Sequence, residues 1–117
     1  MKNLPTPFEL FGIEVGKGWW RLVEPIYDRI QELNKAGAEI DITQVKEKYG
    51  ELCIYVSGAP DEIWDMIKQA EKKSIHICEH CGKPGERVIS RSSWIYTLCP
   101  ECIQEKGIKV SGTVNDN

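Results

Sequence analysis

Four cysteines near the C-terminal end of this 117-residue chain have the spacing of ligands for one metal ion. They form two Cys-x-x-Cys pairs, Cys78 with Cys81 and Cys99 with Cys102, with 17 residues between the pairs. Two cysteines three positions apart can direct both sulfurs at one ion when the backbone turns tightly, and Gly82 permits such a turn. The pattern predicts a single Zn²⁺ of structural type, because four thiolates leave no coordination position for a catalytic water. An iron–sulfur cluster is the alternative that four cysteines leave open.

The second cysteine pair is expected to open a short helix. Pro100 suits the first helical position and Gly107 suits the C-terminal cap. The N-terminus of a helix also favours thiolates, because its free amides and dipole stabilise negative charge. Residues 83–98, between the pairs, alternate as a β-hairpin does. Knuckle, hairpin and helix together predict a treble-clef-like zinc module over residues 75–110, with a zinc ribbon as the alternative if the helix is absent.

The residues before this module predict a compact α-β-β-α layer over residues 18–74. Apolar residues recur at helical spacing over 19–35, where Pro25 must kink the helix or occupy the first turn of a shorter one. Residues 39–57 alternate as a hairpin, and residues 61–74 again have helical spacing. The expected fold class is therefore α+β.

The two ends of the chain are expected to lie outside these elements. Pro5 and Pro7 disfavour an early helix, so residues 1–17 predict an extended arm. Residues 111–117 are small and polar and predict a flexible tail.

Composition restricts the environment and the class of partner. No stretch approaches the roughly 20 apolar residues that span a bilayer, and the N-terminal residues lack the apolar run of a signal peptide. A cytoplasmic location is expected, and in that compartment clustered cysteines indicate metal binding rather than disulfides. The formal net charge of −3 disfavours nonspecific binding of nucleic acid, where neutralisation of phosphates supplies most of the affinity.

Several residues are candidates for an interaction surface. Adjacent residues on a helix point roughly 100° apart, so Trp19 fits the apolar stripe while Trp20 falls at its edge. Tryptophan is favoured where proteins bind one another. The possible interaction surface comprises Trp20, Lys83, Arg87 and Arg91.

The remaining cysteine and the two histidines are given structural interpretations. Cys53 lies on a predicted strand and is expected to pack as a small apolar side chain. His80 falls at the tip of the first knuckle and is expected to be exposed, whereas His76 is expected to pack. The chain has no HExxH motif and no phosphate-binding loop.

Three segments together resemble a group of small uncharacterised proteins of bacteria and their phages. These are the GWW at residues 18–20, the QVKEKYGEL at 44–52 with the IYV at 54–56 that follows it, and the CEHCGKPG at 78–85. The corresponding features in that group are a GW-helix, a KEKFG-type hairpin and a C-terminal CxxCGxPG knuckle followed by a second cysteine group. The resemblance covers roughly residues 16–106. It implies an architecture and a bacterial or phage origin, but no catalytic residues.

Taken together, these features predict a small non-enzymatic zinc protein that acts by binding another macromolecule, with a protein as the favoured partner. A phage-encoded modulator of a host defence or regulatory protein is a special case of this prediction. One alternative is a nucleic-acid-binding module that uses basic residues around the zinc. The other is an enzyme with an unrecognised site. The sequence does not indicate an oligomeric state.

Overall fold

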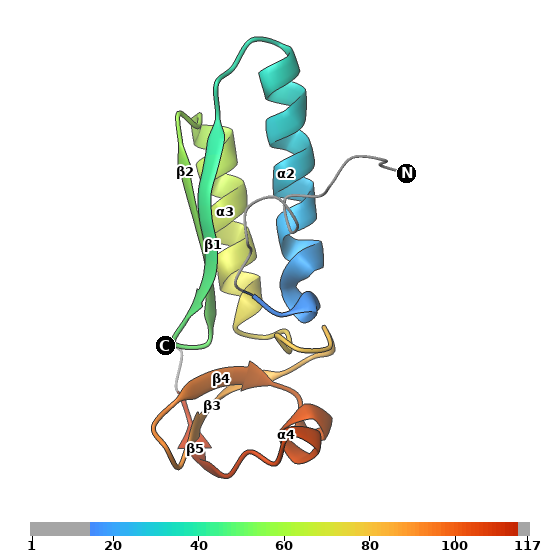
Figure 1. Ribbon diagram of the computed structural model, residues 1–117, viewed down its shortest axis with the longest axis vertical. Helices are drawn as coiled ribbons and strands as arrows, with labels where there is room; N and C mark the ends of the chain where they lie inside the picture. The colour runs from blue at the N-terminus through green and yellow to red at the C-terminus, as the bar shows by residue number, and fades with distance from the viewer. Residues whose placement is uncertain (1–14, 115–117) are drawn as a thin grey trace.

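A computed structural model describes the fold of residues 15–114 (Figure 1). Most of the predicted arm and the last residues of the predicted tail lie outside this range. The described part contains helices and two small antiparallel sheets, one of order β1-β2 and one of order β4-β3-β5. In chain order its elements are η1 (Lys17–Trp19), α2 (Trp20–Lys35), β1 (Asp41–Lys48), β2 (Glu51–Ser57), α3 (Asp61–Ser74), β3 (Glu86–Ser90), β4 (Ile95–Leu98), α4 (Pro100–Lys106) and β5 (Val110–Thr113).

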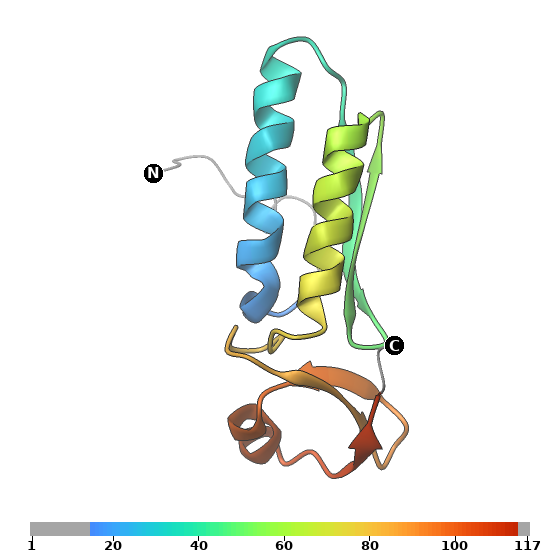
Figure 2. The same cartoon turned by 180° about the vertical axis from the view of Figure 1, so that it is seen from behind.

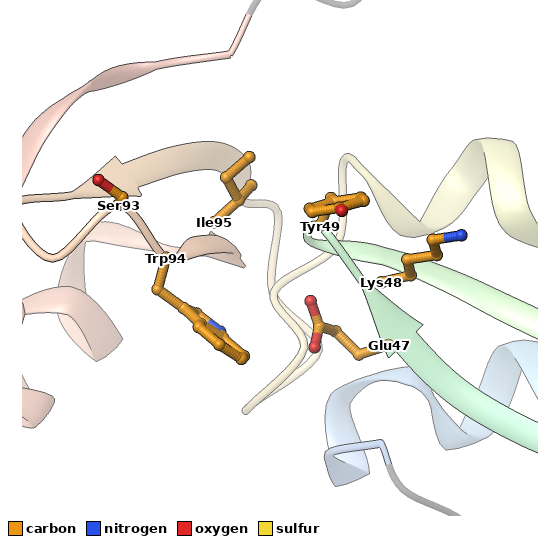
Figure 3. A pocket seen from close by; sticks show the side chains of 6 residues that line it. All are labelled: Glu47, Lys48, Tyr49, Ser93, Trp94 and Ile95. Atoms are coloured by element: carbon orange, nitrogen blue, oxygen red, sulfur yellow. The ribbon is translucent and has the colours of Figure 1, made fainter.

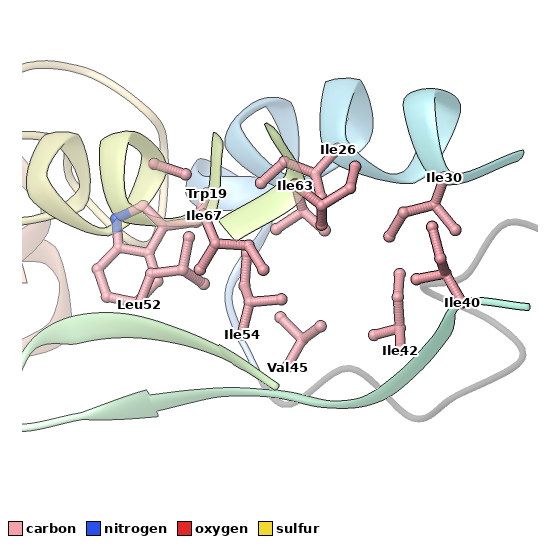
Figure 4. Close-up of a cluster of buried hydrophobic side chains, with 12 residues drawn as sticks. Trp19, Ile26, Ile30, Ile40, Ile42, Val45, Leu52, Ile54, Ile63 and Ile67 are labelled. Atoms are coloured by element: carbon pink, nitrogen blue, oxygen red, sulfur yellow. The ribbon is translucent and has the colours of Figure 1, made fainter. Parts of the chain in front are cut away.

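Helices α2 and α3 lie side by side against one face of the β1–β2 hairpin (Figures 1 and 2). The predicted order of helix, hairpin and helix is therefore present. Their shared core is aliphatic apart from one indole, and Figure 4 shows its side chains meeting between the helices and the strands. Its buried members are Trp19, Val23, Ile26, Ile30, Ile40, Ile42, Val45, Leu52, Ile54, Ile63, Ile67 and Ala70.

The start of the first helix differs from one sequence-based alternative. The 3-10 turn η1 leads directly into α2, and Pro25 lies inside that helix. A first-turn position for Pro25 in a shorter helix is therefore wrong. Because proline has no amide N–H, the carbonyl of Arg21 loses its helical donor at this point. Because Pro25 is exposed, the carbonyl of Arg21 can accept a hydrogen bond from another donor without disturbing the core.

The outer edge of strand β2 is hydrogen-bonded to side chains of α3. The amide of Leu52 donates to Oγ of Ser74 at 3.0 Å, and the amide of Ile54 donates to a carboxylate oxygen of Glu71 at 3.1 Å. The Ser74 hydroxyl in turn donates to the carbonyl of Glu71 at 2.6 Å. A two-stranded sheet leaves such amides without a strand partner, so these polar residues of α3 supply the missing acceptors.

The C-terminal module contains a strand that the sequence analysis missed. Strand β5 pairs antiparallel with β3, with Val88 opposite Thr113 and Ile89 opposite Gly112. Ser111 also donates its hydroxyl to the carbonyl of Ile89 at 3.1 Å. The predicted flexible tail is therefore wrong for residues 111–113, and the module extends beyond its predicted end at residue 110. The physical reason is that the backbone N–H and C=O groups on the second edge of β3 need hydrogen-bond partners. Backbone pairing of this kind does not require apolar side chains.

Candidate metal centre

The first cysteine pair lies on a tight knuckle closed by backbone hydrogen bonds. The amide of Gly82 donates to the carbonyl of Cys78 at 2.9 Å, and the amide of Cys78 donates to the carbonyl of Lys83 at 2.7 Å. Gly82 has a φ of 85°, in the left-handed region that favours glycine. The turn predicted at Gly82 is confirmed, and it places Cys78 and Cys81 on the same side of the loop.

The second cysteine pair lies at the start of α4, as predicted. Cys99 is the N-cap residue, and its sulfur accepts a hydrogen bond from the amide of Cys102 at 3.4 Å. Pro100 occupies the first turn, and Gly107 ends the helix with a left-handed φ of 68°. The helix start therefore directs both sulfurs toward the knuckle.

All four cysteines come together in one cluster. Their sulfurs lie within 4.8 Å of one another, and those of Cys81 and Cys99 are 3.6 Å apart. Four sulfurs bound tetrahedrally at about 2.3 Å from an ion would be separated by about 3.8 Å, which fits this spacing. The four thiols are free, and the separation exceeds the roughly 2.05 Å of a disulfide. The cluster could therefore hold a metal ion.

The electrostatics of the cluster also favour a bound cation. Burial raises the pKa of the Cys78 thiol, but amide donors from Cys81, Cys99 and His80 outweigh that effect and lower its pKa to about 7. Burial and the neighbouring sulfurs raise the pKa of Cys102 far above its ordinary value. The raised pKa of Cys102 means that its thiolate is disfavoured beside the other sulfurs, and a bound cation would compensate that charge.

The knuckle is joined to the start of the first helix through its backbone. The amide of Gly18 donates to the carbonyl of Glu79 at 3.0 Å. The indole of Trp19 donates to the carbonyl of Ile77 at 2.8 Å, and a guanidinium nitrogen of Arg21 donates to the carbonyl of Gly82. Gly18 and Trp19 thus position the metal-site backbone, a role that the sequence analysis did not assign to them.

Glu79 ties the knuckle to strand β4. Its amide donates to the carbonyl of Thr97, and its carboxylate accepts a hydrogen bond from the amide of Thr97, both at 2.9 Å. Burial raises the pKa of the Glu79 carboxyl to about 7. The sequence offered no means of finding this residue, because its partner lies 18 positions away on a strand.

The β1–β2 turn makes a second junction with the C-terminal module. Arg87 donates to the carbonyl of Tyr49 from two guanidinium nitrogens, at 3.2 and 3.0 Å. The hydroxyl of Thr97 donates to the carbonyl of Gly50. A Cβ at Gly50 would lie 3.1 Å from both Ile95 and Tyr96, so the turn approaches β4 closely. The two parts of the molecule are therefore joined at the knuckle and at this turn.

The four predicted interaction residues differ in their surroundings. Trp20 is half-buried, and its indole donates to the carbonyl of Val15 at 3.4 Å. Lys83 is exposed and forms an ion pair with Glu101 at 3.0 Å, whereas Arg91 is exposed on the β3–β4 turn. The guanidinium of Arg87 lies at the junction just described.

The remaining cysteine and the histidines are now placed. Cys53 is half-buried on β2, and burial raises the pKa of its thiol, as expected for a packed side chain. His80 is exposed as predicted and lies 3.9 Å from a carboxylate oxygen of Glu105. His76 is also exposed, so the prediction that it packs is wrong.

Comparison of the chain with protein-family models, with curated proteins and with solved structures finds no match. The resemblance to small bacterial and phage proteins therefore stays a prediction. Among the helices of residues 15–114, none is long and apolar enough to cross a membrane.

Proposed function

We propose that the four cysteines hold one structural Zn²⁺ and that the C-terminal module is of treble-clef type. Support for zinc comes from the all-sulfur donor set and its tetrahedral spacing. Support for the treble clef comes from the second cysteine pair, which lies at the N-terminus of α4 rather than on a second knuckle. A metal with four protein thiolates has no vacant position for substrate, so its contribution is to stability.

The purified 117-residue chain is expected to contain about one zinc, because one cluster of four cysteines binds one ion. Elemental analysis after expression without added metal would measure this. A stoichiometry near zero would contradict the proposed site. Visible absorption of an iron–sulfur cluster would contradict zinc while keeping the cysteine ligands.

The chain as a whole is proposed to be a non-enzymatic protein that binds another protein. The observation that carries this proposal is the exposure of large aromatic side chains, led by Tyr49 in the β1–β2 turn at 64% and Trp94 directly before β4 at 57%. Aromatic residues are enriched at protein–protein interfaces, where their burial provides much of the binding energy. If the chain is phage-encoded, a host defence or regulatory protein is the expected class of partner.

The basic residues around the metal centre give less support to nucleic-acid binding. Arg87 donates to a backbone carbonyl within the protein, and the ammonium of Lys83 is paired with Glu101. Arg91 and Lys106 remain exposed, but two exposed cations on a chain of net charge −3 are a weak electrostatic site for phosphates.

The test of the proposed function is capture followed by reconstitution. Immobilised zinc-loaded protein should retain a partner from nuclease-treated bacterial lysate, and that partner, once purified, should bind the free chain saturably in calorimetry. A chain reduced and stripped of metal is the matched control and should not retain it. Retention from untreated lysate that is absent from nuclease-treated lysate would favour the nucleic-acid alternative. Chemical turnover of the captured molecule would favour an enzyme.

A further inference from the structure

A groove of about 220 Å³ lies where the β1–β2 turn meets the start of β4. Figure 3 shows its side chains, which come from elements far apart in the sequence. Its lining residues are Glu47, Lys48, Tyr49, Ser93, Trp94 and Ile95. The groove exists only because the two parts of the molecule are joined at this turn.

The aromatic residues of the groove belong to neither buried core, although the ring of Trp94 lies 6.5 Å from that of Tyr96. Tyr49 has a φ of 53° in a two-residue turn, where asparagine or glycine adopts the backbone with less strain. Its ring is also largely exposed, at 64%, and so contributes little to the core. Trp94 on the opposite wall is exposed at 57%. Both side chains are therefore available to a binding partner.

The backbone beneath these aromatic residues is well held. Arg87 fixes the carbonyl of Tyr49, and the carboxylate of Glu47 accepts a hydrogen bond from the amide of Gly50 at 2.8 Å. The amide of Trp94 donates to Oγ of Ser90 at 3.0 Å. A site held in this way loses little conformational entropy when it binds.

The charge within the groove is negative where it faces the aromatic wall. In Figure 3 the carboxylate of Glu47 points toward the indole of Trp94, whereas the ammonium of Lys48 points away from it. A carboxylate beside an indole face attracts a cation, because both the charge and the quadrupole of the ring favour one.

We propose that this groove binds a basic side chain, arginine or lysine, of a partner protein, with its cation stacked on Trp94 and paired with Glu47. Tyr49 forms the adjacent wall and covers the aliphatic stem of the incoming side chain. The inference rests on the proposed function and specifies where and by what chemistry the partner is recognised.

The same chemistry disfavours nucleic acid as the occupant. Proteins that stack single-stranded bases on aromatic side chains combine those residues with lysine and arginine along the backbone path. Here the charged group directed at Trp94 is a carboxylate, which repels phosphate. The favoured ligand is therefore a cationic side chain.

The test uses small probes and the zinc-loaded full chain, so it does not depend on knowing the partner. A blocked Gly-Arg-Gly peptide is titrated against ¹⁵N-labelled protein, with a Gly-citrulline-Gly peptide as the neutral isostere. The arginine peptide should shift the Trp94 indole and the amides of residues 47–50 saturably. The citrulline peptide should bind at least about fivefold more weakly, because it lacks the charge.

Two variants and one matched control assign the effect to the groove. Trp94→Ala and Glu47→Gln should each weaken the arginine peptide about threefold or more. The glutamine keeps an oxygen that can accept from the amide of Gly50, so the turn should remain folded. Trp64→Ala removes another exposed tryptophan, on α3, and should leave binding unchanged.

Three results would overturn the proposal: equal binding of the two peptides, no saturable shift in the groove, or stronger shifts of the same signals by an oligothymidylate. Failure here is distinguishable from failure of the proposed function. If a reconstituted protein partner binds the Trp94→Ala variant as well as the native chain, the groove assignment is wrong and the protein-binding function stands.

Discussion

Replacing Gly18 by alanine should weaken both metal binding and folding. Among the described glycines of the helical layer, Gly18 is the one at which we expect an added methyl group to cost most. A Cβ at Gly18 would lie 2.6 Å from the amide nitrogen of Gly82 and 2.8 Å from the carbonyl carbon of Glu79, and it would overlap the carbonyl oxygen of Cys78. All three atoms belong to the backbone of the knuckle, so none can rotate away. Either the knuckle or the start of α2 must move, at a cost of about 3 kcal/mol or more.

Urea denaturation would measure the loss of stability, and competition with a chelator would measure the loss of zinc affinity. Gly112→Ala is the matched control, because a Cβ at Gly112 has no atom within 4 Å. It should change stability by no more than about 0.5 kcal/mol. A Gly18→Ala protein with native stability and native zinc affinity would show that the knuckle does not depend on its contact with the helix.

Removal of the metal should unfold the C-terminal module before the helical layer. The two parts have separate buried clusters: the layer has its aliphatic core, and the module has Leu98 with the cysteines themselves. Binding of structural zinc contributes on the order of 10 kcal/mol, which a core this small cannot replace. Hydrogen exchange after chelation should therefore show lost protection over residues 78–106.

Within the layer, the same experiment should show a gradient. Gly18, Trp19 and the turn at residues 49–50 bond to the module and should lose protection with it, whereas Ile30 and Ile40 lie at the far end of the core and should keep theirs (Figure 4). Simultaneous loss of protection throughout residues 15–114 would show that the two clusters fold as one unit.

Local patterns in the sequence predicted most elements and the composition of the candidate metal site. Helical spacing identified the Val23, Ile26 and Ile30 stripe, and the turn chemistry of Gly82, Pro100 and Gly107 identified both cysteine environments. Each of these features depends on neighbours within a few positions, which is what periodicity and capping rules describe.

The features that escaped prediction depend on contacts between distant segments. Strand β5 forms because β3 has a free edge, although residues 110–113 have no apolar alternation. Nothing in the sequence indicated that the small size of Gly18 permits contact with the knuckle some 60 residues later. Tyr49 could have been identified from the sequence as a residue with a role beyond the turn. A tyrosine before glycine at the tip of a hairpin occupies a position that suits asparagine.

The hydrogen bonds from β2 to α3 have a further consequence for the behaviour of the protein at high concentration. An open strand edge is a template on which another chain can add a strand, and this is a common route to aggregation. On β2 the outward amides of Leu52 and Ile54 are already bonded to Ser74 and Glu71. A hairpin that would otherwise recruit strands from its neighbours is thereby protected along this edge by a helix of its own chain.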